Sequence, residues 1–156
     1  QLSFGNVPVL DRKDLATIFL IRDNLGKRPI YFSWSAGGFP DQTLGLTPYL
    51  VTHGFVRKLN PEPVKPGGSI VMSAGMGWMD LERTKALMWD TYRWQSAGRA
   101  RPQGWIDIPS RSILDIYSAL YAGFAATLRQ EGDSVGAARA DSISTVVARS
   151  LRPRKE

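Results

Sequence analysis

The sequence predicts an α+β protein in which a small, mostly parallel α/β unit of two to three strands precedes a helical half. Two short runs, residues 29–35 and 55–59, are rich in β-branched and aromatic residues and are bounded by Gly, Pro or Asn, which is typical of buried strands. Residues 110–151 instead repeat apolar side chains at helical spacing. These patterns place strands early in the chain and long helices late.

Glycine and proline mark the division between the two halves. They interrupt residues 60–79 so often that long regular structure is not expected there. We therefore expect a small α/β unit over residues 1–62, an irregular Gly/Pro-rich linker over residues 63–79 and a helical subdomain over residues 80–156. A chain of 156 residues is long enough for these parts to form one continuous globular domain.

Charge and composition restrict the function classes. The formal net charge is +6 and the pI is near 9.9, which suits an acidic partner or an anionic surface. The charge is spread along the chain, so a nucleic-acid partner is the less favoured interpretation. The chain has no cysteine, which excludes disulfides and thiolate sites. No apolar run is long enough to span a bilayer, and no signal peptide is visible, so we expect a processed chain or a piece of something longer.

The first helix is expected over residues 11–24. Asp11 is a good N-cap, and Asp14 lies three residues later, at the capping-box position. Gly26 is expected to close the helix. The strand at 29–35 is apolar nearly throughout, so we expect a central strand covered on both faces.

A short second helix is expected over residues 48–53, because Thr47 and Pro48 resemble an N-cap followed by Pro at the first helical position. Gly54 would end it, and residues 55–59 would form a strand parallel to the first. Residues 69–73 are a candidate third strand.

The second half is expected to be helical. Asp80 should cap a helix over residues 81–96, and Ser110 or Ser112 should begin a helix that runs to residue 131. After a stop at Gly132, Asp133 should start a last helix that Pro153 ends. These two last helices are expected to form an antiparallel hairpin that resembles one tetratricopeptide-like unit.

Catalytic and cofactor patterns are weak. His53 is the only histidine and is expected to be a helix-terminal surface group. The segments Gly67-Gly68-Ser69 and Gly75-Met76-Gly77 lack the phosphate-loop Lys-Ser/Thr pattern and are interpreted as turns. We expect no catalytic residue, no cofactor and no metal site. Asp80, like Asp11 and Asp133, is interpreted as a helix cap.

Tryptophan and arginine side chains around the loops give the strongest binding signal. Aromatic and Arg side chains are enriched in contact patches. Packing of the helical half onto the α/β half is an equally good interpretation of these tryptophans. The candidate partner contacts are Trp78, Trp94, Arg99, Arg101 and Trp105.

Several weak motifs occur in one order along nearly the whole chain, from about Val9 to Leu151. They include Arg28-Pro29-Ile30-Tyr31-Phe32, Leu44-Gly45-Leu46, Gly54-Phe55-Val56-Arg57-Lys58-Leu59, Met79-Asp80-Leu81-Glu82-Arg83-Thr84, and Gly132-Asp133 with Ala137-Ala138. In this order the chain resembles the soluble C-terminal region of a bacterial membrane-protein family of unknown function. That family is related to the transmembrane protein O-mannosyltransferases of the GT-C class. One departure is His53, where the family commonly has Glu.

The resemblance implies an extracytoplasmic domain at the periplasmic face of the membrane, with the transfer chemistry in a multi-pass part that this sequence does not include. The first functional hypothesis is a non-catalytic domain that binds or scaffolds an integral membrane protein or membrane complex. The second is a processed, free-standing structural subunit of a larger assembly, for example a photosynthetic reaction centre–antenna complex. A small hydrolase is disfavoured because no catalytic constellation is placed by any motif.

Overall fold

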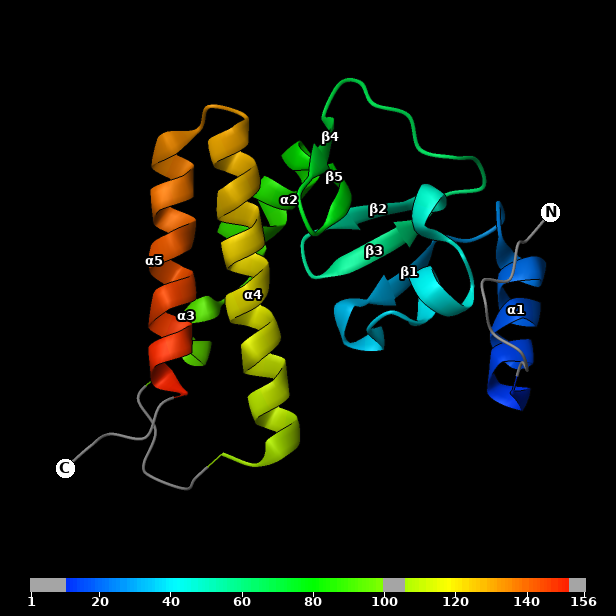
Figure 1. Cartoon of the computed structure of the whole chain (residues 1–156), viewed down its shortest axis with the longest axis horizontal. Helices are drawn as coiled ribbons and strands as arrows, with labels where there is room; N and C mark the ends of the chain where they lie inside the picture. The colour runs from blue at the N-terminus through cyan, green and yellow to red at the C-terminus, as the bar shows by residue number, and fades with distance from the viewer. Residues whose placement is uncertain (1–10, 100–105, 152–156) are drawn as a thin grey trace. The chain divides into compact units, whose positions relative to one another are not determined.

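A five-stranded sheet and five α-helices build the chain, as the computed structural model describes it for residues 11–99 and 106–151 (Figure 1). Contacts divide the chain into two units, which are described one at a time. The first unit comprises Gln1–Val71 and Gly77–Thr84, and the second comprises Met72–Met76 and Lys85–Glu156. The predicted mixture of strands and helices is therefore present, whereas the boundaries predicted from the sequence remain a prediction.

Helix α1 (Arg12–Asn24) forms as its sequence predicts. Asp11 and Asp14 make a reciprocal capping box, in which the Asp14 carboxylate accepts the Asp11 backbone N–H at 2.9 Å. At the other end, Gly26 has a φ of +79°, which a residue with a Cβ adopts only at a cost. The helix therefore begins and ends for local reasons.

The sheet, most of which belongs to the first unit, differs from the prediction. Its strands are β1 (Ile30–Ser33), β2 (Leu50–His53), β3 (Val56–Leu59), β4 (Ile70–Ser73) and β5 (Gly77–Asp80), in the order β1-β3-β2-β5-β4. Both β1 and β2 pair antiparallel with β3, whereas β2 pairs parallel with β5. The expected mostly parallel unit of two to three strands is therefore wrong in both direction and strand number.

Two local features explain the error. Residues 48–53 are not a helix: Thr47–Tyr49 is a single 3₁₀ turn, and β2 follows it directly. The β-branched pair Val51 and Thr52 prefers an extended backbone. Gly54, at φ +59°, then starts a two-residue hairpin turn instead of ending a helix. A hairpin of this length forces the next strand to run antiparallel.

Strand β1 is also not the central strand that its apolar sequence predicts. It lies at the end of the sheet order, and the Tyr31 side chain is 48% exposed. Its other face joins the core of the first unit, where Ile30 and Phe32 pack with Ile21, Leu50 and Leu59. Apolar residues on an edge strand are unusual, because the unpaired N–H and C=O groups of that edge can pair with a strand of another chain.

An arginine is buried in this unit. The guanidinium of Arg57 is ion-paired with Asp41, donates a hydrogen bond to the Gly37 carbonyl at 3.0 Å and stacks over the Trp34 ring at 4.6 Å. The contacts join β3 to the π-helical turn Phe39–Thr43. A buried charge needs such partners, so we assign Arg57 a structural role.

The second unit contains the helices of the C-terminal half. The predicted helix over residues 81–96 is broken into α2 (Leu81–Ala86), a π-helical turn (Leu87–Thr91) and α3 (Trp94–Ala97). Then come α4 (Ile108–Gln130), capped by Asp107 rather than by Ser110 or Ser112, and α5 (Ser134–Ser150), capped by Asp133 as predicted. Helices α4 and α5 pack along their lengths as a helical hairpin (Figure 1). Most of α2 belongs to the first unit by its contacts.

The core of the hairpin is tightly filled. Tyr121, Phe124 and Leu128 of α4 are fully buried together with Val147 of α5. Trp89 lies against this core, with its ring centroid 5.2 Å from that of Phe124. These residues have the spacing of one helical face, which is the pattern from which the helices were predicted.

Candidate functional site

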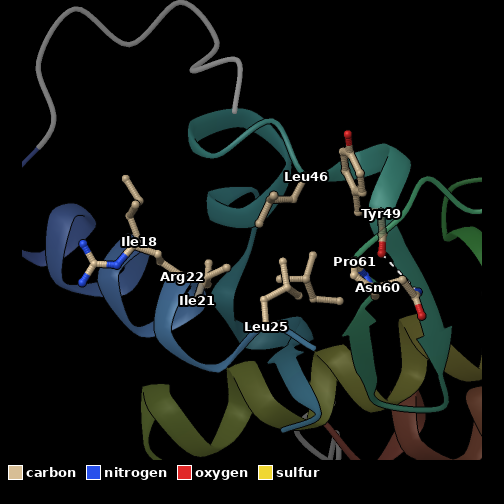
Figure 2. Close-up of a pocket in the computed structure, with 9 residues that line it drawn as sticks. Ile18, Ile21, Arg22, Leu25, Leu46, Tyr49, Asn60 and Pro61 are labelled. Atoms are coloured by element: carbon tan, nitrogen blue, oxygen red, sulfur yellow. Dashed lines mark hydrogen bonds between the residues drawn. The ribbon is translucent and has the colours of Figure 1, made fainter. Parts of the chain in front are cut away.

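An apolar cavity of about 280 Å³ lies in the first unit between α1 and the sheet (Figure 2). Helix α1 supplies Ile18, Ile21 and Arg22 from one face of its last two turns, and its C-cap residue Leu25 follows them. The opposite wall comes from the loops and strand ends around the hairpin, with Leu46, Tyr49, Leu59, Asn60 and Pro61. The Asn60 side-chain amide donates to the Tyr49 carbonyl at 3.2 Å and fixes that wall.

A second hollow, here called the edge groove, lies beside it along β1. It has a volume of about 330 Å³, and its walls are one face of α1 and the first edge strand. Helix α1 contributes Thr17, Leu20, Ile21 and Asn24, and the strand with the turn before it contributes residues 28–32. The spacing i, i+3, i+4 and i+7 is that of a single helix face.

Apolar side chains remain exposed around the edge groove. Leu20 is 65% exposed and Phe19 51% exposed on α1. The run Ile18-Phe19-Leu20-Ile21 is the signal that sequence reasoning missed, because four consecutive apolar residues on a helix point in four directions. One face can pack on a sheet, so some of these side chains must face outward.

Positive charge gathers where the groove and the cavity meet. A third hollow there is lined by Lys27, Arg28 and Lys58, among others. None of the three forms an ion pair with an acid in the part of the chain that the structure describes. The nearby Arg22 is different, since it pairs with Asp23 at 2.7 Å and its hydrogen bond lowers the pKa of that carboxyl. We call Lys27, Arg28 and Lys58 the basic cluster.

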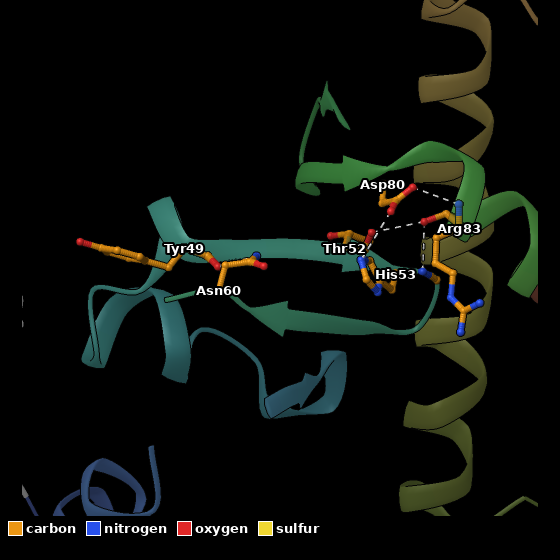
Figure 3. A network of polar contacts seen from close by, with 8 residues as sticks. Tyr49, Thr52, His53, Asn60, Asp80 and Arg83 are labelled. Carbon is orange, nitrogen blue, oxygen red and sulfur yellow. Dashed lines mark hydrogen bonds and ion pairs between the residues drawn. The ribbon is translucent and has the colours of Figure 1, made fainter. Parts of the chain in front are cut away.

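His53 lies at the end of β2 rather than at the end of a helix. Its Nε2 is 3.9 Å from Asp80 Oδ2, and its side chain is 14% exposed (Figure 3). Burial lowers the pKa of His53 and outweighs the opposing charge of Asp80. The prediction of a helix-terminal surface histidine was therefore wrong, because residues 50–53 are a strand.

The groups around His53 are engaged in local structure. Asp80 accepts the Arg83 backbone N–H at 3.0 Å, which is the predicted N-cap of the following helix. Thr84 accepts the Gly54 N–H at 3.2 Å and donates to the Thr52 carbonyl at 3.3 Å (Figure 3). These bonds fasten the hairpin turn to the helix, so we interpret this cluster as structural. Over residues 11–99 and 106–151, no three His, Asp or Glu side chains are grouped to hold a metal ion.

The predicted Trp/Arg contact surface is divided between the two units. Trp78 is half-buried on β5 of the first unit, whereas Trp94 and the exposed Arg99 belong to the second unit. Trp94 packs close to Gly98 of its own turn. The remaining predicted contacts, Arg101 and Trp105, lie outside the described residues. Neither unit by itself brings the predicted set together, and the contact surface stays a prediction.

Comparison with known proteins gives no relative: no family model, no curated protein and no solved structure matches this chain. Within the described helices, none is both long and apolar enough to cross a membrane. The assignment of a function therefore depends on the geometry of the chain itself.

Proposed function

We propose that this chain is a non-catalytic binding module that scaffolds a membrane-protein assembly at the periplasmic face of the membrane. Two arguments support the proposal. The sequence resembles the soluble C-terminal region of GT-C-related membrane proteins, with a tetratricopeptide-like helical hairpin at its end. The structure contributes an apolar groove beside three cations, Lys27, Arg28 and Lys58, that form no ion pair with an acid among the described residues.

The observation that carries the proposal is the joint presence of the edge groove and the basic cluster. Leu20 and Tyr31 expose apolar surface at the groove, and Arg28 lies at its end. Apolar surface next to uncompensated positive charge is what an acidic, partly apolar partner surface requires. The polar side chains Asn60, Asn24 and Arg22, which also line the cavity or the groove, are held within the chain by hydrogen bonds or an ion pair, so the apolar surface and the basic cluster are what the site offers a partner.

The test is co-purification from the native membrane under mild detergent, followed by intact-mass analysis. We expect the chain to be recovered in a fixed ratio with integral membrane proteins and to be released in part at high salt, because exposed charges are screened within about 3 Å at 1 M ionic strength. Recovery in the supernatant alone, at low and high salt, would contradict the proposal.

The intact mass also separates the two forms of the proposal. A mass equal to that of the 156-residue chain supports a processed, free-standing subunit, for which a reaction centre–antenna complex is one example. A larger mass that includes a multi-pass part supports a domain of a GT-C-like protein. Hydrolase activity abolished by His53→Ala would overturn the non-catalytic assignment in either form.

A further inference from the structure

We propose that the edge groove binds an extended segment of a partner protein, which adds a strand to the outer edge of β1 and presents an acidic side chain to the basic cluster. The inference rests on the proposed function, because it names the kind of partner that the binding module accepts. Backbone pairing, apolar contacts and charge each contribute one observation.

The first observation is an open sheet edge. β1 is the last strand of the sheet, with β3 on one side and no strand on the other in the described ranges. Within β1 the sequence Ile-Tyr-Phe-Ser has neither a charge nor a proline, the two features that commonly block pairing at an edge, and Arg28 and Pro29 stand just before the strand. Four residues in extended conformation span about 13 Å, enough for a complementary strand of similar length.

The second observation is the position of the groove along that edge. Residues 28–32 line it consecutively, so the hollow follows the strand rather than meeting it at one point. Leu20 and Ile21 of α1 form the opposite wall. A strand placed on β1 would direct alternate side chains toward these residues, because side chains in a strand alternate between its two faces. Leu20, which is 65% exposed, would gain an apolar contact.

The third observation is charge. Arg28 belongs both to the edge groove and to the basic cluster, so the cations lie at one end of the groove. Lys27 donates to the Asp23 carbonyl at 3.0 Å, but neither it nor Lys58 has an acid as ion-pair partner among the residues described. An Asp, a Glu or a C-terminal carboxylate at the corresponding end of the incoming segment complements them.

Two other occupants fit less of this geometry. An anionic membrane surface would satisfy the cations, but it supplies no row of N–H and C=O groups for the open edge of β1. A second copy of the chain, paired through its own β1, would also supply such a row. That copy carries the same positive charges at the end of its strand, so it brings no negative charge to the groove. A partner segment with an acidic residue matches all three observations.

The experiment uses the full 156-residue chain and a phage-displayed library of random decapeptides. We expect enriched peptides to contain a run of β-branched or aromatic residues next to Asp or Glu. An enriched peptide, synthesised with a fluorescent label, is then titrated by anisotropy. Leu20→Glu and Arg28→Glu should each weaken its binding by about tenfold or more, as loss of a central contact does.

Two matched controls lie on the same helix. Leu15→Glu and Arg12→Glu introduce the same charge changes at positions outside the edge groove, and both should leave the affinity within about twofold. All four variants are checked by far-UV circular dichroism and thermal midpoint, so that loss of folding is not mistaken for loss of binding.

A methylation scan tests the strand itself. Two versions of the enriched peptide carry N-methyl groups on alternate residues, one version on the odd and one on the even positions. Strand addition predicts that one version loses binding, because its methylated nitrogens face β1, and that the other keeps it. Equal binding by both versions would overturn strand addition even if the peptide occupies the groove.

Three results would overturn the inference outright. The first is a library that yields no peptide sensitive to Leu20→Glu. The second is binding of the chain to phosphatidylglycerol vesicles that Arg28→Glu abolishes, in the absence of any peptide binding. The third is a concentration-dependent dimer in sedimentation that Leu20→Glu dissociates. Stoichiometric co-purification from the membrane together with failed peptide binding would reject this inference and leave the proposed function standing.

Discussion

The interiors of the two units are filled to different extents. In the helical unit, Tyr121, Phe124 and Val147 are fully buried, and the core is continuous along α4 and α5. In the sheet unit, α1 covers its side of the sheet incompletely, so that a cavity and a groove remain and Leu20 stays exposed. Exposed apolar side chains also occur on the helices, among them Ile108 and Val135, but in the sheet unit they lie beside a cavity and a groove, and binding capacity is therefore expected there. The four predictions below test this contrast.

The largest expected effect is in the helical core. Phe124→Ala removes a fully buried ring that contacts Trp89 and should lower the free energy of unfolding by about 3–5 kcal/mol. Urea denaturation followed by tryptophan fluorescence measures the change. The matched control is Phe19→Ala on α1, whose ring is 51% exposed and whose loss should cost less than about 1 kcal/mol. Equal costs at the two positions would remove the contrast between the units.

Tyr121→Phe should cost about 1 kcal/mol at neutral pH, because it removes the hydroxyl that donates to the Met88 carbonyl at 3.0 Å. Burial raises the pKa of Tyr121 to about 12 from an ordinary value of 10. The unfolded chain therefore loses this proton more easily, and stability should fall as the pH rises from 10 toward 12.

The measurement for Tyr121 is the free energy of unfolding as a function of pH above 9. The wild-type curve should fall more steeply than that of Tyr121→Phe over this range. Superimposable slopes would show that Tyr121 ionises as easily in the folded protein as in the unfolded chain.

Asp133→Ala should lower the stability of the hairpin, because Asp133 accepts the Gly136 N–H at 2.8 Å at the start of α5. That hydrogen bond, with a further contribution from Lys85 at 3.0 Å, lowers the pKa of Asp133. Its stabilisation is present above the ordinary pKa of 3.8 and is lost as the pH falls below it.

Asp133→Asn is the control for this cap, because Asn also caps helices but carries no charge. It should keep most of the neutral-pH stability and lose the acid dependence. Thermal unfolding at pH 7 and pH 3 provides the comparison. A larger loss for Asn than for Ala at pH 7 would contradict the capping role.

The smallest effect is expected at His53 in the sheet unit. Burial lowers its pKa below the ordinary 6.5, so the unfolded chain takes up the proton first as the pH falls. Stability should be full above pH 6.5 and should decrease below it. His53→Gln removes this decrease between pH 6.5 and 5. The difference between the two pH profiles is the readout, and an unchanged profile would show that His53 titrates normally.

Sequence reasoning succeeded where the cause is local. The capping box of Asp11 and Asp14 was predicted, as were the Asp80 and Asp133 caps. The helical spacing of apolar residues over 110–151 was also predicted, and on α4 it places Leu120, Tyr121, Phe124 and Leu128 in the core, although Ile113 is 55% exposed. Each of these features depends on groups within a few residues of one another along the chain.

It placed β1, β3 and β4 correctly but missed β2, β5 and the direction of pairing, and the candidate site was lost with them. The Thr47-Pro48 signal favoured a helix, and β2 was missed although Val51 and Thr52 are β-branched. β5 was not predicted within the Gly/Pro-rich stretch. The apolar sequence of β1 predicted a central strand, which concealed the open edge and the groove beside it. The run Ile18-Phe19-Leu20-Ile21 was the one available signal for that surface.

The sequence alone therefore determined the caps at Asp11, Asp80 and Asp133, the turns at glycine and the buried face of α4, since backbone capping and side-chain periodicity act over a few residues. Only the tertiary structure decided the order of the strands, the edge position of β1 and the gathering of Lys27, Arg28 and Lys58. Strand order depends on which distant segments pair, and local propensity does not encode that choice. A hydrophobic strand has the same sequence signature at the centre of a sheet and at its edge, and here the edge position leaves a surface open for a partner.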